Sequence, residues 1–285
     1  MTKSRSYQAP DGVTLVADDA GAQEAPTVIL LHGGGQTRHS WSGAMKALVA
    51  RGFRVINFDA RGHGDSSWSE QGCYSLDDRV SDLKAVTAEL DQPFALVGAS
   101  LGGATAIHAV ALGLEPAAIV LVDIVPAPEP VGINRIVGFM RSTLGGFDDI
   151  DEAAAAVAAY NSHRKRPSDP EGLRRNLRTR DDGRLYWHYD PRIVAVDPEM
   201  HHGLVQRSSH ALADRLDMSV LLVRGLSSDV VSDDGIAAFR AILPTLEVVD
   251  VGGAGHMVSG DRNDAFNASV IEFLGRVMPT AALPS

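Results

Sequence analysis

The sequence GASLG at residues 98–102 constrains the fold most, because it stands between a strand-like run and a helix-like segment. The apolar run at residues 94–97 predicts a buried strand, and the alanine-rich residues 103–111 favour a helix. A turn this sharp crowds the backbone, and the flanking glycines remove the Cβ atoms that would clash. The pattern therefore predicts that the hydroxyl of Ser100 is held at the edge of a sheet, at the N-terminus of a helix.

Short apolar runs alternate with helical patterns along most of the chain. Further strands are predicted at residues 27–31, 54–58, 118–122, 220–223 and 246–251, and an antiparallel hairpin at residues 7–18. Helices are predicted near residues 42–50, 76–90, 101–112, 234–243 and 264–277. Near-continuous apolar strands that alternate with helices are typical of a parallel sheet covered on both faces. We therefore expect an α/β fold with a mostly parallel, eight-stranded sheet.

One interval breaks this alternation. Residues 126–205 contain no evident buried strand, and they carry early prolines, an alanine-rich helical pattern and an arginine-rich stretch at 164–184. An excursion this long is uncommon for a loop without secondary structure. We predict a helical cap at residues 126–205, inserted into a core formed by residues 1–125 and 206–285.

The charge and cysteine content exclude several classes of protein. A formal net charge of −10 argues against a nucleic-acid partner or an anionic membrane surface. The single cysteine, Cys73, cannot form an internal disulfide and is consistent with a reducing cytoplasm. The N-terminus lacks the apolar core of a signal peptide, and no run is long enough to span a bilayer. We therefore expect a cytoplasmic protein.

A serine hydroxyl needs a base to take its proton, and His256 is the best candidate for that base. It lies in the glycine-rich sequence GGAGHM, after the last predicted strand. Because the C-terminal ends of parallel strands meet at one edge of a sheet, we expect His256 to lie near Ser100.

The base in turn needs a carboxylate to fix its tautomer. Asp229 follows the strand at residues 220–223, and it gives the chain order Ser, Asp, His. Asp123 follows the strand at 118–122 on the same edge and is the competing candidate. On the chain order we favour Asp229.

Two glycine-rich segments suggest further roles near the serine. The backbone amide of Leu101 points at the group that Ser100 would attack, and Gly34 in the sequence HGGG is the expected second donor to an oxyanion. We expect His32 to support that loop by hydrogen bonding. The sequence DARGHGDS is interpreted as structural, with Asp59 paired to Arg61.

The sequences HGGG, DARGHGDS, GASLGG and GAGHM, in this order, resemble the α/β-hydrolase superfamily, particularly its capped, soluble bacterial members. The resemblance covers nearly the whole chain outside the cap. It implies Ser100 as nucleophile, His256 as base, Asp229 as orienting acid, and Gly34 with Leu101 as oxyanion hole. Epoxide hydrolases and haloalkane dehalogenases of this fold carry aspartate at the nucleophile position, so Ser100 argues against both.

These residues predict hydrolysis of an ester or lactone, a small-molecule acyl substrate, through an acyl-enzyme, without a metal or organic cofactor. Alternatives are carbon–carbon bond hydrolysis of a ring-cleavage product, cofactor-free perhydrolysis, and a non-catalytic ligand receptor. We expect a monomer or homodimer. The arginine-rich stretch at 164–184 is interpreted as a solvated surface rather than a carboxylate site. Candidate pocket residues are Trp187, Tyr186, Phe139 and Met257.

Overall fold

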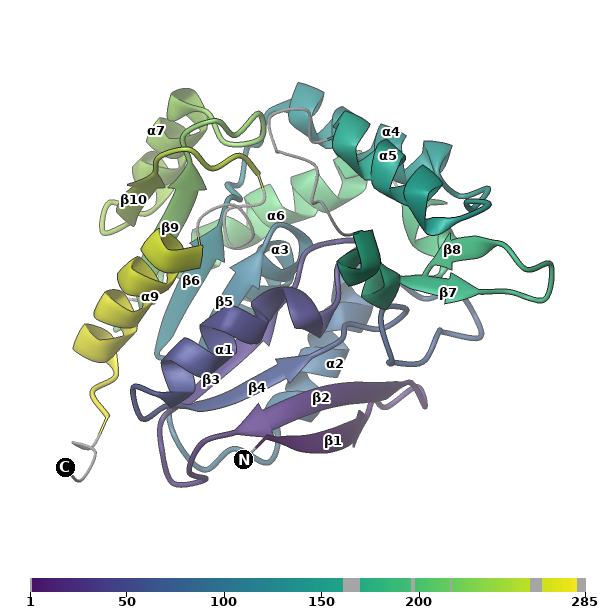
Figure 1. The fold of residues 1–285 in the computed structure, drawn as a ribbon. Coiled ribbons are helices and arrows are strands. Elements are labelled where there is room, and N and C mark those ends of the chain that lie inside the picture. The colour runs from purple at the N-terminus through teal and green to yellow at the C-terminus, as the bar shows by residue number, and fades with distance from the viewer. Residues whose placement is uncertain (1, 161–169, 196–197, 216, 257–262, 281–285) are drawn as a thin grey trace.

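The computed structural model describes residues 2–160, 170–195, 198–215, 217–256 and 263–280 (Figure 1). Eight strands form one sheet in the order β1-β2-β4-β3-β5-β6-β9-β10, and only the β1–β2 and β2–β4 pairs are antiparallel. The strands are β1 (Lys3–Gln8), β2 (Thr14–Ala20), β3 (Thr27–Leu31), β4 (Arg54–Phe58), β5 (Phe94–Ala99), β6 (Ala118–Val122), β9 (Ser219–Gly225) and β10 (Glu247–Val251). The predicted mostly parallel, eight-stranded sheet is confirmed.

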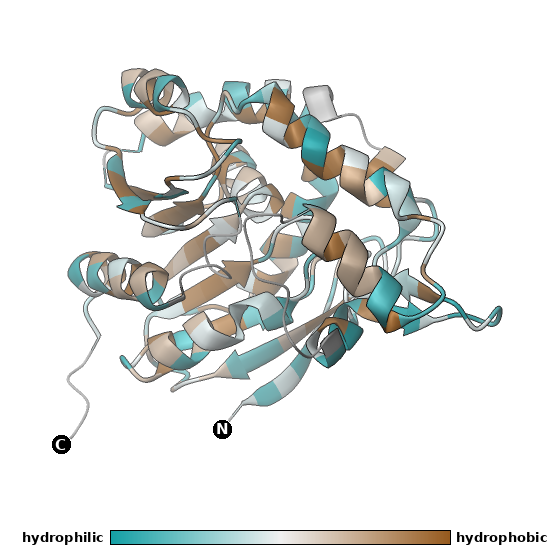
Figure 2. Ribbon diagram, turned by 45° about the horizontal axis from the view of Figure 1, so that its top comes forward, coloured by the Kyte–Doolittle hydropathy of each residue, from teal (hydrophilic) through white to brown (hydrophobic). Residues whose placement is uncertain are grey.

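Helices cover both faces of this sheet, as predicted, and the apolar strands lie at the centre of the molecule (Figure 2). In β3, Ile29 and Leu31 pack toward one face while Val28 and Leu30 pack toward the other, because successive side chains of a strand point in opposite directions. The first face is covered by α2 (Leu76–Thr87), α3 (Leu101–Ala111), α6 (Pro198–Ala213) and α7 (Asp233–Ile242), and the second by η1 (Arg38–Trp41), α1 (Ser42–Val49) and α9 (Asn263–Val277).

The insertion after β6 contains more than helices. Its elements are α4 (Pro130–Ser142), α5 (Ile150–Tyr160), η2 (Pro170–Asn176), β7 (Leu177–Thr179), β8 (Leu185–Trp187) and η3 (Pro191–Ala195). The β7–β8 hairpin was not predicted, because strands of three residues are too short to carry an alternating pattern. These elements share a small apolar cluster of their own around Phe147 and Trp187. In Figure 1, α4 and α5 lie together above the sheet.

The predicted end of the insertion, between residues 205 and 206, falls inside α6. Val205 and Leu212 of this helix are buried in the same apolar cluster as α3, so α6 is a helix of the core.

Within the described residues, no helix combines the length and the apolar character needed to cross a membrane.

Candidate active site

Ser100 occupies the corner between β5 and α3 in a strained conformation, with φ of 46° and ψ of −113°. A non-glycine residue with positive φ costs about 1–3 kcal/mol, which the surrounding structure must offset. The flanking glycines make the corner possible: a Cβ on Gly98 would lie 2.5 Å from the carbonyl carbon of Gly102, and one on Gly102 would overlap Leu31. The Ser100 side chain does not cap α3, so its hydroxyl is available to other groups.

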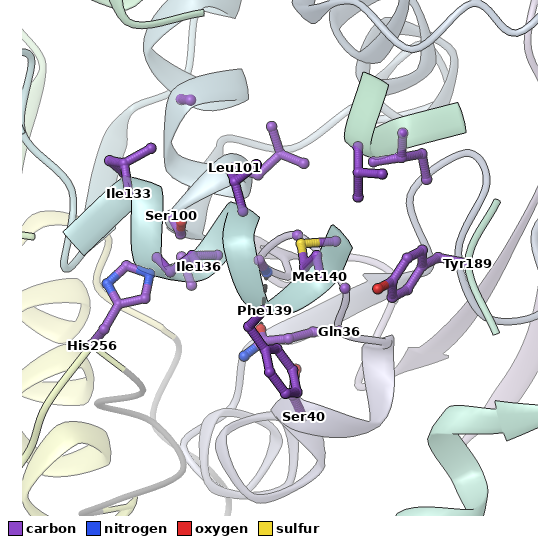
Figure 3. Close-up of a pocket in the computed structure, with 18 of the residues that line it drawn as sticks. Gln36, Ser40, Ser100, Leu101, Ile133, Ile136, Phe139, Met140, Tyr189 and His256 are labelled. Carbon is purple, nitrogen blue, oxygen red and sulfur yellow. Dashed lines mark hydrogen bonds between the residues drawn. The ribbon is translucent and has the colours of Figure 1, made fainter. Parts of the chain in front are cut away.

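Ser100 and His256 line one cavity of about 490 Å³. The core contributes the glycine loop after β3 to the walls, and the insertion contributes mostly apolar side chains. Those from α4 include Ile133, Ile136, Phe139 and Met140 (Figure 3). The serine therefore opens onto an apolar chamber between the core and the insertion.

Asp123 is the carboxylate beside His256. The distance between His256 Nδ1 and Asp123 Oδ2 is 2.7 Å. Asp123 has no exposed surface, and its carboxylate also accepts hydrogen bonds from the Gly225 amide at 3.1 Å and the Ser228 hydroxyl at 2.5 Å. A carboxylate at Nδ1 favours the tautomer that carries its proton there and leaves Nε2 as the basic nitrogen.

The predicted pairing of Asp229 with His256 is therefore wrong. Asp229 forms an ion pair with Arg135 of α4, at 3.0 Å between Oδ2 and Nε, and its side chain is 31% exposed. This ion pair connects the loop after β9 to the insertion. The carboxylate that contacts Nδ1 of His256 is instead that of Asp123, the competing candidate from the sequence.

Gly34 and Leu101 lie next to each other at the cavity wall, where a Cβ on Gly34 would be 3.7 Å from Leu101 Cδ2. The neighbouring amides are already engaged, since Gly33 donates to the Gln36 side chain at 3.0 Å and Gly35 donates to His63 at 3.1 Å. The Gly34 amide has no acceptor among the described residues, and Leu101 begins α3, so its N–H has none within the helix. Two amides beside Ser100 are thus available to an oxygen of a bound molecule.

Three buried histidines hold this loop in place. His32 donates to the Gly33 carbonyl at 2.8 Å and accepts a hydrogen bond from the Ala60 amide at 2.9 Å, as expected of a residue that supports the loop. His63 accepts from the Gly35 amide, and His188 of the insertion donates to the Gly35 carbonyl at 3.2 Å. Burial lowers the pKa of all three, that of His188 to about 4. They are therefore neutral near pH 7 and act through hydrogen bonds rather than charge.

Asp59 and Arg61 do not pair with each other, which corrects the predicted contact. Asp59 accepts from the backbone amide and the guanidinium of Arg38. Arg61 forms a bidentate ion pair with Asp82, in which both N–O distances are 2.7 Å, and it also contacts Asp11. The segment is structural, as interpreted, but its partners come from other elements.

Only some of the four predicted pocket residues line the cavity. Trp187 and Phe139 line the cavity. Tyr186 lies outside it, because adjacent strand residues point to opposite sides; its hydroxyl donates to Asp182 at 2.8 Å and the Arg180 guanidinium covers its ring at 3.9 Å. Met257 lies outside the described residues.

The arginine-rich stretch lies mostly at the surface, as interpreted. Of its described arginines only Arg175 lines the cavity, and others pair with acids: Arg174 with Glu171, Arg178 with Asp65 and Arg184 with Asp148. The sequence offered no signal for Arg79, a cavity residue that lies on α2 far from the motifs.

The comparisons with known proteins agree with this architecture. Residues 26–262 match the family model described as the alpha/beta hydrolase fold. The chain is 32% identical over 269 residues to the esterase Rv0045c of Mycobacterium tuberculosis, which covers 90% of this chain and 84% of that protein.

Solved structures show the same fold. A structure of the M. tuberculosis esterase superposes with a TM-score of 0.75 at 28% identity, covering 96% of this chain and 92% of the other. The structure of E-2-(acetamidomethylene)succinate hydrolase has a TM-score of 0.82 at 24% identity, covering 96% and 99%. The chain belongs to the α/β-hydrolase family and is similar over most of its length to an esterase.

Proposed function

We propose that this hydrolase cleaves a carboxylic ester through an acyl-enzyme formed on Ser100. The observation that carries the proposal is the 2.7 Å contact between His256 and the buried Asp123, at the cavity onto which Ser100 opens. It fixes the tautomer of His256 in which Nε2 can take the serine proton. Ser100 and His256 are not hydrogen-bonded to each other in the described structure, and such contacts commonly tighten when substrate binds.

In the proposed cycle, His256 removes the proton of Ser100 as the serine oxygen attacks the ester carbonyl. The amides of Gly34 and Leu101 donate to the resulting oxyanion. His256 then protonates the leaving alcohol, and a water molecule, deprotonated by the same imidazole, releases the acid and restores the serine. A lactone, which is an internal ester, would follow the same steps.

The walls of the cavity and the relatives favour an ester substrate over the other candidates. A cavity of about 490 Å³ with mostly apolar walls suits a small organic ester. The 32% identity to a mycobacterial esterase supports ester cleavage over carbon–carbon cleavage or perhydrolysis. We place the reaction in the cytoplasm, because a chain with the single cysteine Cys73 needs no oxidising compartment.

A fluorophosphonate probe tests this proposal directly, because it reacts covalently with an activated serine. Wild-type protein should be labelled at Ser100, and Ser100→Ala should lose both labelling and p-nitrophenyl ester turnover, by roughly a millionfold in kcat. Ser40→Ala is the matched control, since Ser40 also lines the cavity but donates its hydroxyl to the Thr37 carbonyl. It should still be labelled at Ser100. Folded wild-type protein that takes no label, or takes it at Ser40, would overturn the proposal.

A further inference from the structure

Arg79 is a buried cation whose guanidinium forms no ion pair with the residues that the structure describes. It lies on α2 with 4% of its surface exposed, and its Nε and Nη1 atoms are buried without a hydrogen-bond acceptor among the described residues. Buried charges in proteins are normally paired, because removal from water is costly and a lone charge recovers none of that cost. Arg79 lines the main cavity, so part of its side chain borders space that a ligand can enter.

The acids near Arg79 are engaged elsewhere. Asp82 binds Arg61 through both carboxylate oxygens at 2.7 Å. Asp78 accepts from the Ser75 amide at 2.8 Å as part of the cap of α2. Burial lowers the pKa of Arg79 to about 10, which leaves the guanidinium charged at neutral pH. This end of the cavity therefore has a positive charge that no carboxylate of the described part of the chain contacts.

Arg79 also lies beside Leu101. It lines both the main cavity and a second, small cavity of about 20 Å³, and Leu101 lines the same two. Leu101 follows Ser100 directly and supplies one of the proposed oxyanion amides. A substrate that extends from Ser100 past Leu101 would therefore approach Arg79.

We propose that Arg79 binds a carboxylate of the substrate, so that the preferred ester carries an anionic group, as in a half-ester of a dicarboxylic acid. The inference rests on the proposed ester hydrolysis and names its substrate class. A guanidinium suits this role because its planar N–H groups match the two oxygens of a carboxylate. A neutral apolar ester would leave the buried charge without a partner.

The test compares two esters of equal chain length, mono-p-nitrophenyl glutarate and p-nitrophenyl valerate, which differ by a terminal carboxylate. Wild-type protein should have a higher kcat/KM for the glutarate ester, and Arg79→Met should lower the ratio of the two kcat/KM values by roughly 10- to 100-fold. Arg79→Lys, which keeps the charge, should retain part of the preference. Arg175→Met removes the exposed guanidinium at the same cavity and should leave the ratio unchanged.

A binding measurement separates this inference from the proposed chemistry. Glutarate should raise the Tm of Ser100→Ala protein, and the shift should disappear when Arg79→Met is added. A wild-type preference for valerate, an unchanged ratio in Arg79→Met, or an equal loss in Arg175→Met would overturn the inference. The inference would also fail if Arg79→Met lowered the Tm but left the ratio of the two kcat/KM values unchanged. That result would indicate a purely structural arginine whose partner is one water in the small cavity. Failure of fluorophosphonate labelling would instead overturn ester hydrolysis itself.

Discussion

Two aspartates follow parallel strands at the same edge of the sheet, and they do different work. Asp123 follows β6, is fully buried, and holds His256 at 2.7 Å. Asp229 follows β9 by a few residues, is 31% exposed, and holds Arg135 of the insertion. One carboxylate orients a side chain of the cavity, and the other fastens the insertion to the core.

The difference comes from the backbone and from neighbours distant in sequence. Asp123 has a positive φ of 52°, which among the described non-glycine residues it shares only with Ser100. Its carboxylate is turned inward, where the Gly225 amide and the Ser228 hydroxyl complete its hydrogen bonds. Both aspartates stand between Ser100 and His256 in the chain, so the chain order cannot distinguish them. Burial and backbone strain do.

The largest expected effect separates the two aspartates by activity. Asp123→Asn should lower kcat for a p-nitrophenyl ester by roughly 10⁴-fold, because an amide at this position favours the wrong tautomer of His256. Asp229→Asn should leave kcat within about twofold, since its contacts are with Arg135. Steady-state kinetics of the two purified variants, with their far-UV circular dichroism spectra compared, provide the measurement.

The opposite outcome would break the comparison. If Asp229→Asn were inactive while Asp123→Asn retained turnover, the contact at His256 would not describe the working enzyme. The fluorophosphonate reaction gives a second measure, because Asp123→Asn should slow labelling of Ser100 as well as turnover.

Local sequence signals predicted the fold and two of the proposed catalytic residues. The run before Ser100 and the small residues after it fix a strand, a corner and a helix within some twenty residues of chain. His256 was predicted in the same way, because it follows a strand in a glycine-rich loop. Such signals depend on neighbours in the sequence, so they are readable without coordinates.

The contacts that failed prediction depend on pairing across the fold. Asp59 binds Arg38, which lies 21 residues away, and Arg61, two residues away, binds Asp82 instead. No periodicity encodes such choices, because they follow from which loops the sheet brings together. The position of Arg79 at the cavity depends on the fold in the same way, since the α2 pattern is that of an ordinary helix.

A second expected effect concerns His188, a buried histidine that connects the insertion to the core. Its imidazole accepts a hydrogen bond from the Gly64 amide at 2.7 Å and donates one to the Gly35 carbonyl. Burial lowers its folded-state pKa from 6.5 to about 4. Its neutral form is therefore favoured on folding, and this stability is full above pH 6.5 and is lost as the pH falls toward 4. Between pH 7.5 and pH 5 the free energy of unfolding should fall by roughly 2 kcal/mol on account of His188.

Urea unfolding of His188→Gln at both pH values measures this contribution, because glutamine does not titrate. The variant should be less stable at pH 7.5 but should lose less stability on acidification than the wild type. His210→Gln, a change at an exposed histidine of α6, is the control and should keep the wild-type pH dependence. A pH dependence that His188→Gln leaves intact would mean that other groups cause the acid sensitivity.

The smallest expected effect is that of the exposed ion pair between Arg135 and Asp229, which connects the insertion to the core. Their side chains are 44% and 31% exposed, so water and salt screen the attraction. A double-mutant cycle with Arg135→Ala and Asp229→Ala should give a coupling energy of about 0.2–1 kcal/mol, decreasing at high salt. A coupling of several kcal/mol would mean that Asp229 is as firmly held as Asp123, and the contrast between the two strand ends would fail. A small, salt-sensitive coupling beside an intact kcat would assign Asp229 to the insertion alone, and leave Asp123 as the carboxylate on which His256 depends.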